Sequence, residues 1–219
     1  MSTNSLVAYA TSDGKVISSY VHYDGYTTGV GEMLLENYHS EELARELATT
    51  LGYASSLRET VEASHEDRAN SVSVETYESY EDFEKMIRES GHLEYVYVWN
   101  EYDKGILNYE GKWSVASWTN TKKKVHNGTC FDYEYDSTWN GFEDLITVYV
   151  REGHALVKRY CEMVEDGTVG EEYLHHADDL EDSVYKWKLV EEGDLSVCLL
   201  YTSDAADDTP CVDLGGRRI

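Results

Sequence analysis

The stretch Leu93-Glu-Tyr-Val-Tyr-Val-Trp99 is the strongest predicted β-strand in the chain. It is rich in β-branched and aromatic residues, which favour the pleated, half-buried environment of a sheet. A turn signal at Glu110-Gly111 leads into a second predicted strand, Lys112–Trp118, in which Trp113 and Val115 fall on one face. The predicted fold is therefore built around a β-sheet.

Strands and helices also alternate before this point. Two short predicted strands, Leu6–Ala10 and Lys15–Val21, flank the turn dipeptide Asp13-Gly14 and indicate a hairpin. Ser40 is placed to cap a helix that Gly52 ends. Further helical segments are predicted at 30–38, at 56–65 and from Ser79 onward, with a strand at 72–77. Residues 1–118 are thus predicted to form an α+β unit, a small antiparallel sheet with helices on one side.

The pattern changes after Trp118. The basic run Lys122-Lys123-Lys124 lies in a polar segment that we interpret as a loop, and Phe131–Asp136 alternates aromatic and acidic residues as a strand would. From 142 to 164 the apolar residues follow a helical period, which predicts one long amphipathic helix with Gly153 as the candidate position for a kink or split. An acidic C-terminal segment follows it. We interpret 119–197 as an acidic strand and helix extension.

The last segment, Cys198–Ile219, resembles translated sequencing adapter. Cys198–Ser203 can be encoded by TGT CTC TTA TAC ACA TCT, which resembles the mosaic end of transposon adapters. Val212–Ile219 fits the flow-cell primer beyond it, in the same frame. A natural acidic tail would have to match both adapter segments in order. We therefore expect residues 198–219 to be non-native and the natural sequence to be cut near Val197.

The charge balance of the chain is strongly acidic. It has 43 acidic and 18 basic residues, a net charge of −25. Phosphate binding needs Lys and Arg to displace counterions, so nucleic acid is excluded as a direct partner. A basic protein partner, steered electrostatically, is compatible with this charge, and so is a purely solubilising role.

The start of the chain, Met1-Ser-Thr-Asn-Ser5, is polar and does not resemble a signal peptide. No apolar run approaches membrane-spanning length. Cys130 and Cys161 lack a disulfide-like pattern and are interpreted as reduced thiols. We expect a cytosolic protein without a membrane partner.

Several motifs of the first half form a recognisable set. They are the start Met1–Ser5, the segments His22–Tyr26, Gly29–Gly31 and Leu34–Tyr38, and the strand Glu94–Val98 followed by Gly111-Lys112-Trp113. On these motifs residues 1–118 resemble a widespread group of tailed-phage and prophage proteins. The sequence departs from the group's pattern at Asn4, Tyr23 and Thr27, where Arg, Trp and Pro are usual. The resemblance implies a phage origin and the host cytoplasm, and it transfers no activity.

The first candidate site is the glycine-rich loop formed by Asp24, Gly25, Tyr26, Gly29 and Gly31. A glycine-rich turn from a strand into a helix can direct backbone N–H groups at an anion. The spacing is not that of a P-loop, and no Lys or Arg lies nearby in the sequence. The alternative is a structural turn that positions Tyr26 against the sheet.

The second candidate is a cluster of metal-ligand residue types, His175, Asp178, Asp179 and Asp182. On a helix, residues three and four apart share a face, so this cluster is compatible with Mg²⁺ or Mn²⁺. Such charge runs are more often solvated faces, and we expect no cofactor.

The third candidate is the acidic row Asp132, Glu134 and Asp136. Regularly spaced carboxylates on a strand can imitate a phosphate backbone and occupy a basic groove. Together these features favour a phage-encoded accessory protein that binds a basic host or phage protein, with counter-defence or DNA mimicry as its role. The alternatives are a metal-dependent hydrolase, a nucleotide-binding enzyme and a structural part of the virion.

Overall fold

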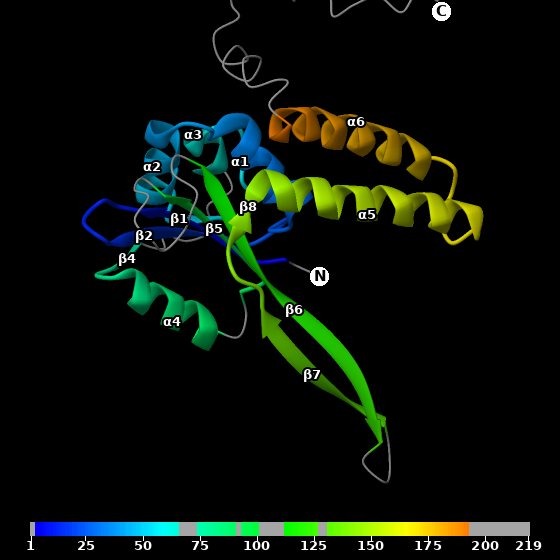
Figure 1. Ribbon diagram of the computed structural model, residues 1–219, viewed down its shortest axis with the longest axis horizontal. Coiled ribbons are helices and arrows are strands. Elements are labelled where there is room, and N and C mark those ends of the chain that lie inside the picture. Colours follow the sequence, from blue (N-terminus) through cyan, green and yellow to red (C-terminus); the bar gives the residue numbers. More distant parts are fainter. Residues whose placement is uncertain (1–2, 66–73, 91–92, 101–111, 127–130, 193–219) are drawn as a thin grey trace, which may run out of the picture.

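The computed structural model describes residues 3–65, 74–90, 93–100, 112–126 and 131–192, with the backbone alone for 119–126 and 131–138. The chain forms a β-sheet with helices on both faces, and two parts project from this body (Figure 1). One projection is a two-stranded ribbon, and the other is a pair of long helices joined by a turn. The α+β class predicted from the sequence is confirmed.

The sheet is mixed rather than wholly antiparallel. Its strands are β1 (Ser5–Ala10), β2 (Val16–Val21), β3 (Tyr53–Ala54), β4 (Glu75–Tyr77), β5 (Tyr95–Asn100), β6 (Trp113–His126), β7 (Phe131–Trp139) and β8 (Glu143–Asp144). The main order is β3-β2-β1-β5-β6-β7, with β4 on β2 and β8 on β6. The pairs β1–β5 and β2–β3 are parallel, which corrects the predicted antiparallel sheet. Both pairs are separated along the chain by helices, and parallel neighbours need such crossover connections.

Helices lie on both faces of the sheet, not on one side as predicted. They are the π-helix η1 (Thr27–Gly31) and the α-helices α1 (Glu32–Asn37), α2 (Glu41–Thr50), α3 (Val61–His65), α4 (Tyr80–Ser90), α5 (Leu145–Glu165) and α6 (Tyr173–Glu191). In Figure 1, α4 lies on the side of the sheet opposite α1, α2, α5 and α6. The central strand β5 is buried on both of its faces, so a cover on one side alone would leave apolar side chains in water.

We call the more heavily packed side the covered face. Val7 and Tyr9 of β1 and Tyr97 and Trp99 of β5 point to it, and all four are at most 3% exposed. Leucines of α1 and α2 pack against them together with residues of α5 and α6. The helix residues of this cluster include Leu34, Leu47, Leu145, Tyr149, Val184 and Trp187. The main apolar core of the protein therefore lies on the covered face.

We call the other side the open face. Leu6 and Ala8 of β1 and Val96 of β5 point to it, and α4 packs Phe83 and Ile87 against them. Phe83 and Ile87 are both fully buried. Of the helices that the structure describes, the amphipathic α4 is the one that covers this face of the sheet.

The predicted helix boundaries around 40 and 79 are confirmed by their caps. Ser40 Oγ accepts a hydrogen bond from the Leu43 amide at 3.3 Å, and Gly52 follows α2 with a φ of +68°. Ser79 Oγ accepts from the Asp82 amide at 3.1 Å at the start of α4. These caps satisfy amides that a helix end leaves unpaired. By contrast, α3 begins at Val61 rather than near 56.

The long helix predicted after residue 142 is confirmed as α5, and it runs unbroken through Gly153. Gly153 therefore does not split the helix, and it has a packing role instead. A Cβ atom at this position would lie 2.3 Å from Cγ2 of the buried Val184 on α6. Glycine lets α5 and α6 approach closely, and the acidic segment after α5 folds back as a second long helix.

The ribbon consists of β6 and β7, paired from Trp118–Trp139 to His126–Phe131. The predicted strand at Phe131–Asp136 is confirmed. The interpretation of Lys122-Lys123-Lys124 as a loop is wrong, because these residues lie within β6. The lysine run is polar and does not alternate with apolar residues, so its sequence does not predict a strand. Its extended conformation comes from pairing with β7.

The described residues before and after position 118 share one strand, β6, and one apolar core. The tail that resembles adapter sequence, 198–219, lies outside the described residues. Among the helices that the structure describes, none is long and apolar enough to cross a membrane.

Candidate functional site

The glycine-rich loop connects β2 to α1, and its backbone amides donate hydrogen bonds to carbonyl oxygens of the protein itself. Gly25 N donates to Thr3 O at 2.9 Å, and Val30 N donates to Asp24 O at 2.8 Å. The amides of Gly29 and Gly31 both donate to Tyr26 O, at 3.0 and 3.3 Å. These four N–H groups bond within the protein, so the geometry gives the anion-binding hypothesis no support.

The glycines of this loop meet steric requirements. A Cβ at Gly25 would lie 2.7 Å from Thr3 O, and one at Gly29 would lie 2.3 Å from Asp24 O. The buried Tyr97 hydroxyl donates to Gly25 O at 2.8 Å and ties the loop to the sheet. The loop is therefore a rigid support, and its contribution to a site comes from the side chains it presents.

Those side chains line a cavity of about 890 Å³ between the loop, β5 and the α5–α6 pair, which we call the tyrosine pocket. Its aromatic and half-buried acidic residues are Tyr26, Tyr95, Tyr160, Tyr173, Glu32 and Glu152. Pockets that bind ligands combine apolar or aromatic walls with a few convergent polar groups. This cavity has that composition.

Hydroxyl groups fix the two carboxylates of the pocket. Thr27 Oγ1 donates to Glu152 Oε2 at 2.6 Å. Tyr149 and Ser183 donate to Glu32 Oε1 at 2.9 and 2.6 Å. These bonds join η1 and α1 to α5 and α6, and they hold each carboxylate in one orientation.

The aromatic residues that line the pocket contact one another, and some of them are partly desolvated. The Tyr160 and Tyr173 rings lie 6.0 Å apart edge to face, and His176 lies 5.6 Å from Tyr173. Burial, with a smaller contribution from the Glu152 charge, raises the pKa of Tyr95 to about 12. Burial also raises the pKa of Tyr26, and the negative charge of Asp24 makes a smaller contribution in the same direction. These phenols are therefore neutral at physiological pH and offer ring faces rather than negative charge.

The predicted metal residues lie on the first turns of α6. His175, Asp178, Asp179 and Asp182 are all exposed, and of the four only Asp179 lines the tyrosine pocket. Within the described ranges, no group of three or more His, Cys, Asp or Glu side chains is arranged to hold a metal ion. The predicted helical spacing is present, but no other element brings a further ligand to it.

The predicted acidic row lies on the ribbon. Asp132, Glu134 and Asp136 occupy alternate positions of β7, and in the register Lys123 of β6 is opposite Glu134. A basic position therefore faces the centre of the row. The row is also separate in sequence and fold from the tyrosine pocket.

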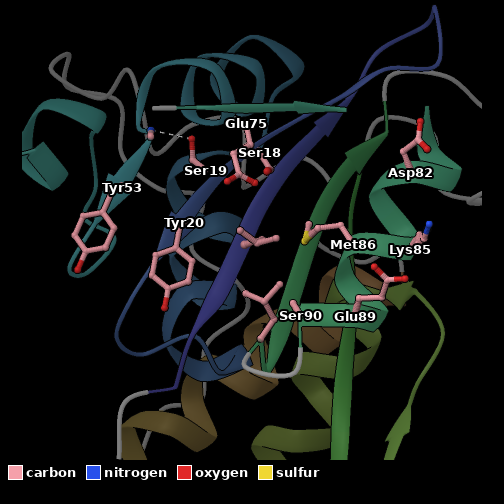
Figure 2. Close-up of a pocket in the computed structure, with 13 residues that line it drawn as sticks. Ser18, Ser19, Tyr20, Tyr53, Glu75, Asp82, Lys85, Met86, Glu89 and Ser90 are labelled. Atoms are coloured by element: carbon pink, nitrogen blue, oxygen red, sulfur yellow. Dashed lines mark hydrogen bonds between the residues drawn. The ribbon is translucent and has the colours of Figure 1, made fainter. Parts of the chain in front are cut away.

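Figure 2 shows a second cavity, of about 740 Å³, on the open face beside α4. The rings of Tyr20 and Tyr53 stack at 5.7 Å on one side, and Met86 projects from α4 on the other. Its charged lining residues, Glu75, Asp82, Lys85 and Glu89, are all exposed. Charges in water interact weakly with a ligand, so the tyrosine pocket is the better candidate site.

Comparisons with protein-family models, with curated protein sequences and with solved structures found no match. The resemblance to phage proteins stays a prediction. Of the predicted site residues, Tyr26 and Asp179 come together in the pocket. Sequence reasoning missed Glu152, which lies three residues after Tyr149 and four before Leu156 on the same helix face. An acidic residue on an apolar face was the available signal.

Proposed function

We propose that the protein is an acidic binding protein that engages a basic protein partner through the α5–α6 pair. One observation carries this proposal. Between 162 and 182 the chain has no Lys or Arg, and this segment forms the turn and the adjoining helix ends at the far end of the projecting pair (Figure 1). Its exposed acids are Glu162, Glu165, Asp166, Glu171, Glu172, Asp178, Asp179, Glu181 and Asp182.

This charge distribution favours a basic partner for two reasons. Carboxylates of one sign on a projecting element attract an oppositely charged surface over about a Debye length, ~8–10 Å at physiological salt. They also repel nucleic acid and other acidic proteins. A factor of this kind would act in the host cytoplasm. A phage origin, counter-defence and DNA mimicry are parts of the same proposal and rest on the sequence resemblance and the charge.

The test measures binding of the whole chain to poly-L-arginine, with poly-L-glutamate as the negative control, at 50 and 200 mM salt. We expect affinity for poly-L-arginine that falls steeply with salt, and competition by double-stranded DNA for the same probe. If the chain does not bind poly-L-arginine at low salt, the proposal is overturned.

Two variants of equal charge locate the contact. The first variant, called the hairpin variant because its changes lie in the helical hairpin formed by α5 and α6, combines Glu171→Gln, Glu172→Gln, Asp178→Asn and Asp182→Asn. The control variant combines four exposed acids elsewhere, Glu59→Gln, Glu62→Gln, Glu81→Gln and Glu89→Gln. We expect the hairpin variant to bind at least about fivefold more weakly than the control. Equal losses would mean that net charge alone is responsible.

The enzyme alternative has its own readout. A metal-dependent hydrolase should show a thermal shift with Mn²⁺ that the changes His175→Ala and Asp179→Asn abolish. The proposed function predicts no thermal shift with Mn²⁺ and unchanged binding of poly-L-arginine by the His175→Ala variant.

A further inference from the structure

We propose that the tyrosine pocket binds the guanidinium group of an arginine side chain from the partner. This inference rests on the proposed function and adds the chemical group that is recognised. It follows from the charge balance of the pocket, from its aromatic walls and from the groups at its rim.

Within the described part of the chain, the two carboxylates of the pocket form no ion pair. Among the described residues, no Lys, Arg or His nitrogen lies within 4.0 Å of Glu32 or Glu152. By contrast, Glu36, one turn further along α1, pairs with Lys186 at 3.0 Å. The hydrogen-bond donors that the described residues direct at these two carboxylates are neutral hydroxyls, and a partly desolvated carboxylate gains from pairing with a cation. The pocket therefore has the charge balance of a site that is completed by a cation.

The walls favour an organic cation. The pocket presents four tyrosine rings, of which Tyr26 is 40% and Tyr173 is 36% exposed. A cation over an aromatic face is attracted by the ring quadrupole, and partial desolvation strengthens this attraction. A strongly hydrated metal ion gains little from such walls, because it would keep its water shell.

Arginine fits this arrangement better than lysine. A guanidinium group is planar, more weakly hydrated than an ammonium group, and able to stack on a ring while donating to carboxylates at its edge. Thr27 already occupies one lone pair of Glu152, so the remaining acceptor capacity favours a donor group with several N–H bonds. The volume of the cavity, about 890 Å³, accommodates a whole arginine side chain.

The rim carries one competing cation. Arg159 lines the pocket and is exposed, as is His176, while Asp179 lies on the same rim with the opposite charge. If the pocket takes a cation, Arg159 repels it. If the pocket takes an anion instead, Arg159 attracts it. The effect of neutralising Arg159 therefore has opposite signs for the two ligand classes.

The experiment titrates the full chain with N-acetyl-arginine-N-methylamide and follows the tyrosine ring resonances by NMR. The citrulline analogue is the neutral control, and the lysine analogue tests the preference for guanidinium. We expect shifts confined to tyrosine rings that line the pocket, and binding of the citrulline analogue at least about tenfold weaker. Equal binding of arginine and citrulline would overturn the inference.

A matched pair of Glu→Gln variants assigns the effect to the pocket. Glu152→Gln should weaken binding of the arginine probe about tenfold or more, because the amide keeps the bond from Thr27 but removes the charge. Glu81→Gln removes the same charge from an exposed position on α4, outside the pocket and outside the acidic surface, and should change binding less than about twofold. Equal effects of the two changes would contradict a specific pocket.

Two further variants keep the test decisive. Arg159→Gln should strengthen binding of the arginine probe, and a weakening would assign the pocket to an anion. Tyr173→Leu, at a partly exposed position, should weaken binding without unfolding the chain, which thermal unfolding checks. If the wild type and the Glu152→Gln variant bind poly-L-arginine equally, the inference that the pocket binds a guanidinium group is overturned. The proposed function would remain in place. If the wild type does not bind poly-L-arginine, both the pocket inference and the proposed function are overturned.

Discussion

The covered face and the open face of the sheet are both apolar, but the buried cluster on the covered face is much larger than the one on the open face. On the covered face, four α-helices from both halves of the sequence bury leucines, tyrosines and tryptophans. On the open face, α4 alone contributes Phe83 and Ile87, and a cavity remains beside it (Figure 2). The covered face also adjoins the tyrosine pocket, so stability and the candidate site share the same side of the molecule.

This difference indicates how the site is held. Carboxylates keep one orientation only when rigid elements carry them, and Glu32 and Glu152 lie on helices anchored in the larger cluster. The open face has the smaller buried cluster and is expected to open locally at lower free energy.

The largest expected effect compares equal truncations on the two faces. Leu47→Ala and Ile87→Ala each remove a fully buried side chain, at a cost of about 3 kcal/mol. Leu47→Ala should lower the free energy of global unfolding and increase amide exchange throughout the sheet. Ile87→Ala should increase exchange mainly in α4. Hydrogen exchange measures both, and identical exchange patterns would break the distinction between the faces.

A smaller loss is expected where α5 crosses α6. Gly153→Ala gains about 1 kcal/mol of helix propensity, but its Cβ overlaps Val184, and overpacking costs about 1–3 kcal/mol. We expect a net loss of up to about 2 kcal/mol in chemical denaturation. Gly141→Ala is the matched control, because nothing lies within 4 Å of its added methyl group. Adding Val184→Ala to Gly153→Ala should show favourable coupling in a double-mutant cycle.

Alkaline pH is expected to act mainly through buried tyrosines. Burial raises the pKa of Tyr95 from 10.0 to about 12, and it also raises the pKa of Tyr97 well above its usual value. The folded state therefore binds the phenolic proton more tightly than the unfolded state does. The stability from this difference is present below pH 10 and is lost as pH rises from 10 to 12.

The change Tyr95→Phe tests this pH dependence. The stability gap between wild type and variant, constant near pH 7, should narrow above pH 10 in denaturation curves. A gap that stays constant up to pH 12 would contradict a protonated, buried phenol at this position.

The smallest effect is expected at the surface. Arg151 Nη1 and Nη2 donate to both oxygens of Glu143 at 2.8 and 2.9 Å, but the two side chains are 55% and 43% exposed. Arg151→Gln should cost below about 1 kcal/mol, and less at high salt. The hydrogen bonds from Arg151 lower the pKa of Glu143, so this contribution is present above pH 4.5 and lost as pH falls below it. A loss above 2 kcal/mol in urea titrations would show that Arg151 has a structural role beyond this pair.

The sequence by itself determined the local elements. Ser40 and Ser79 marked helix starts because a serine side chain caps amides a few residues away. The alternation at Phe131–Asp136 and the helical period after 142 were equally local, and the structure contains the predicted elements. The charge that motivates the proposed function was also readable from composition.

Only the tertiary structure decided how these elements combine. The parallel pairing of β1 with β5, the position of α4 on the open face and the close approach at Gly153 depend on neighbours far away in the sequence. The same holds for the tyrosine pocket, where Thr27 meets Glu152 across 125 positions. Periodicity and capping report short-range constraints along one element. Which faces meet is set by burial of the whole apolar surface, and that is a property of the folded chain.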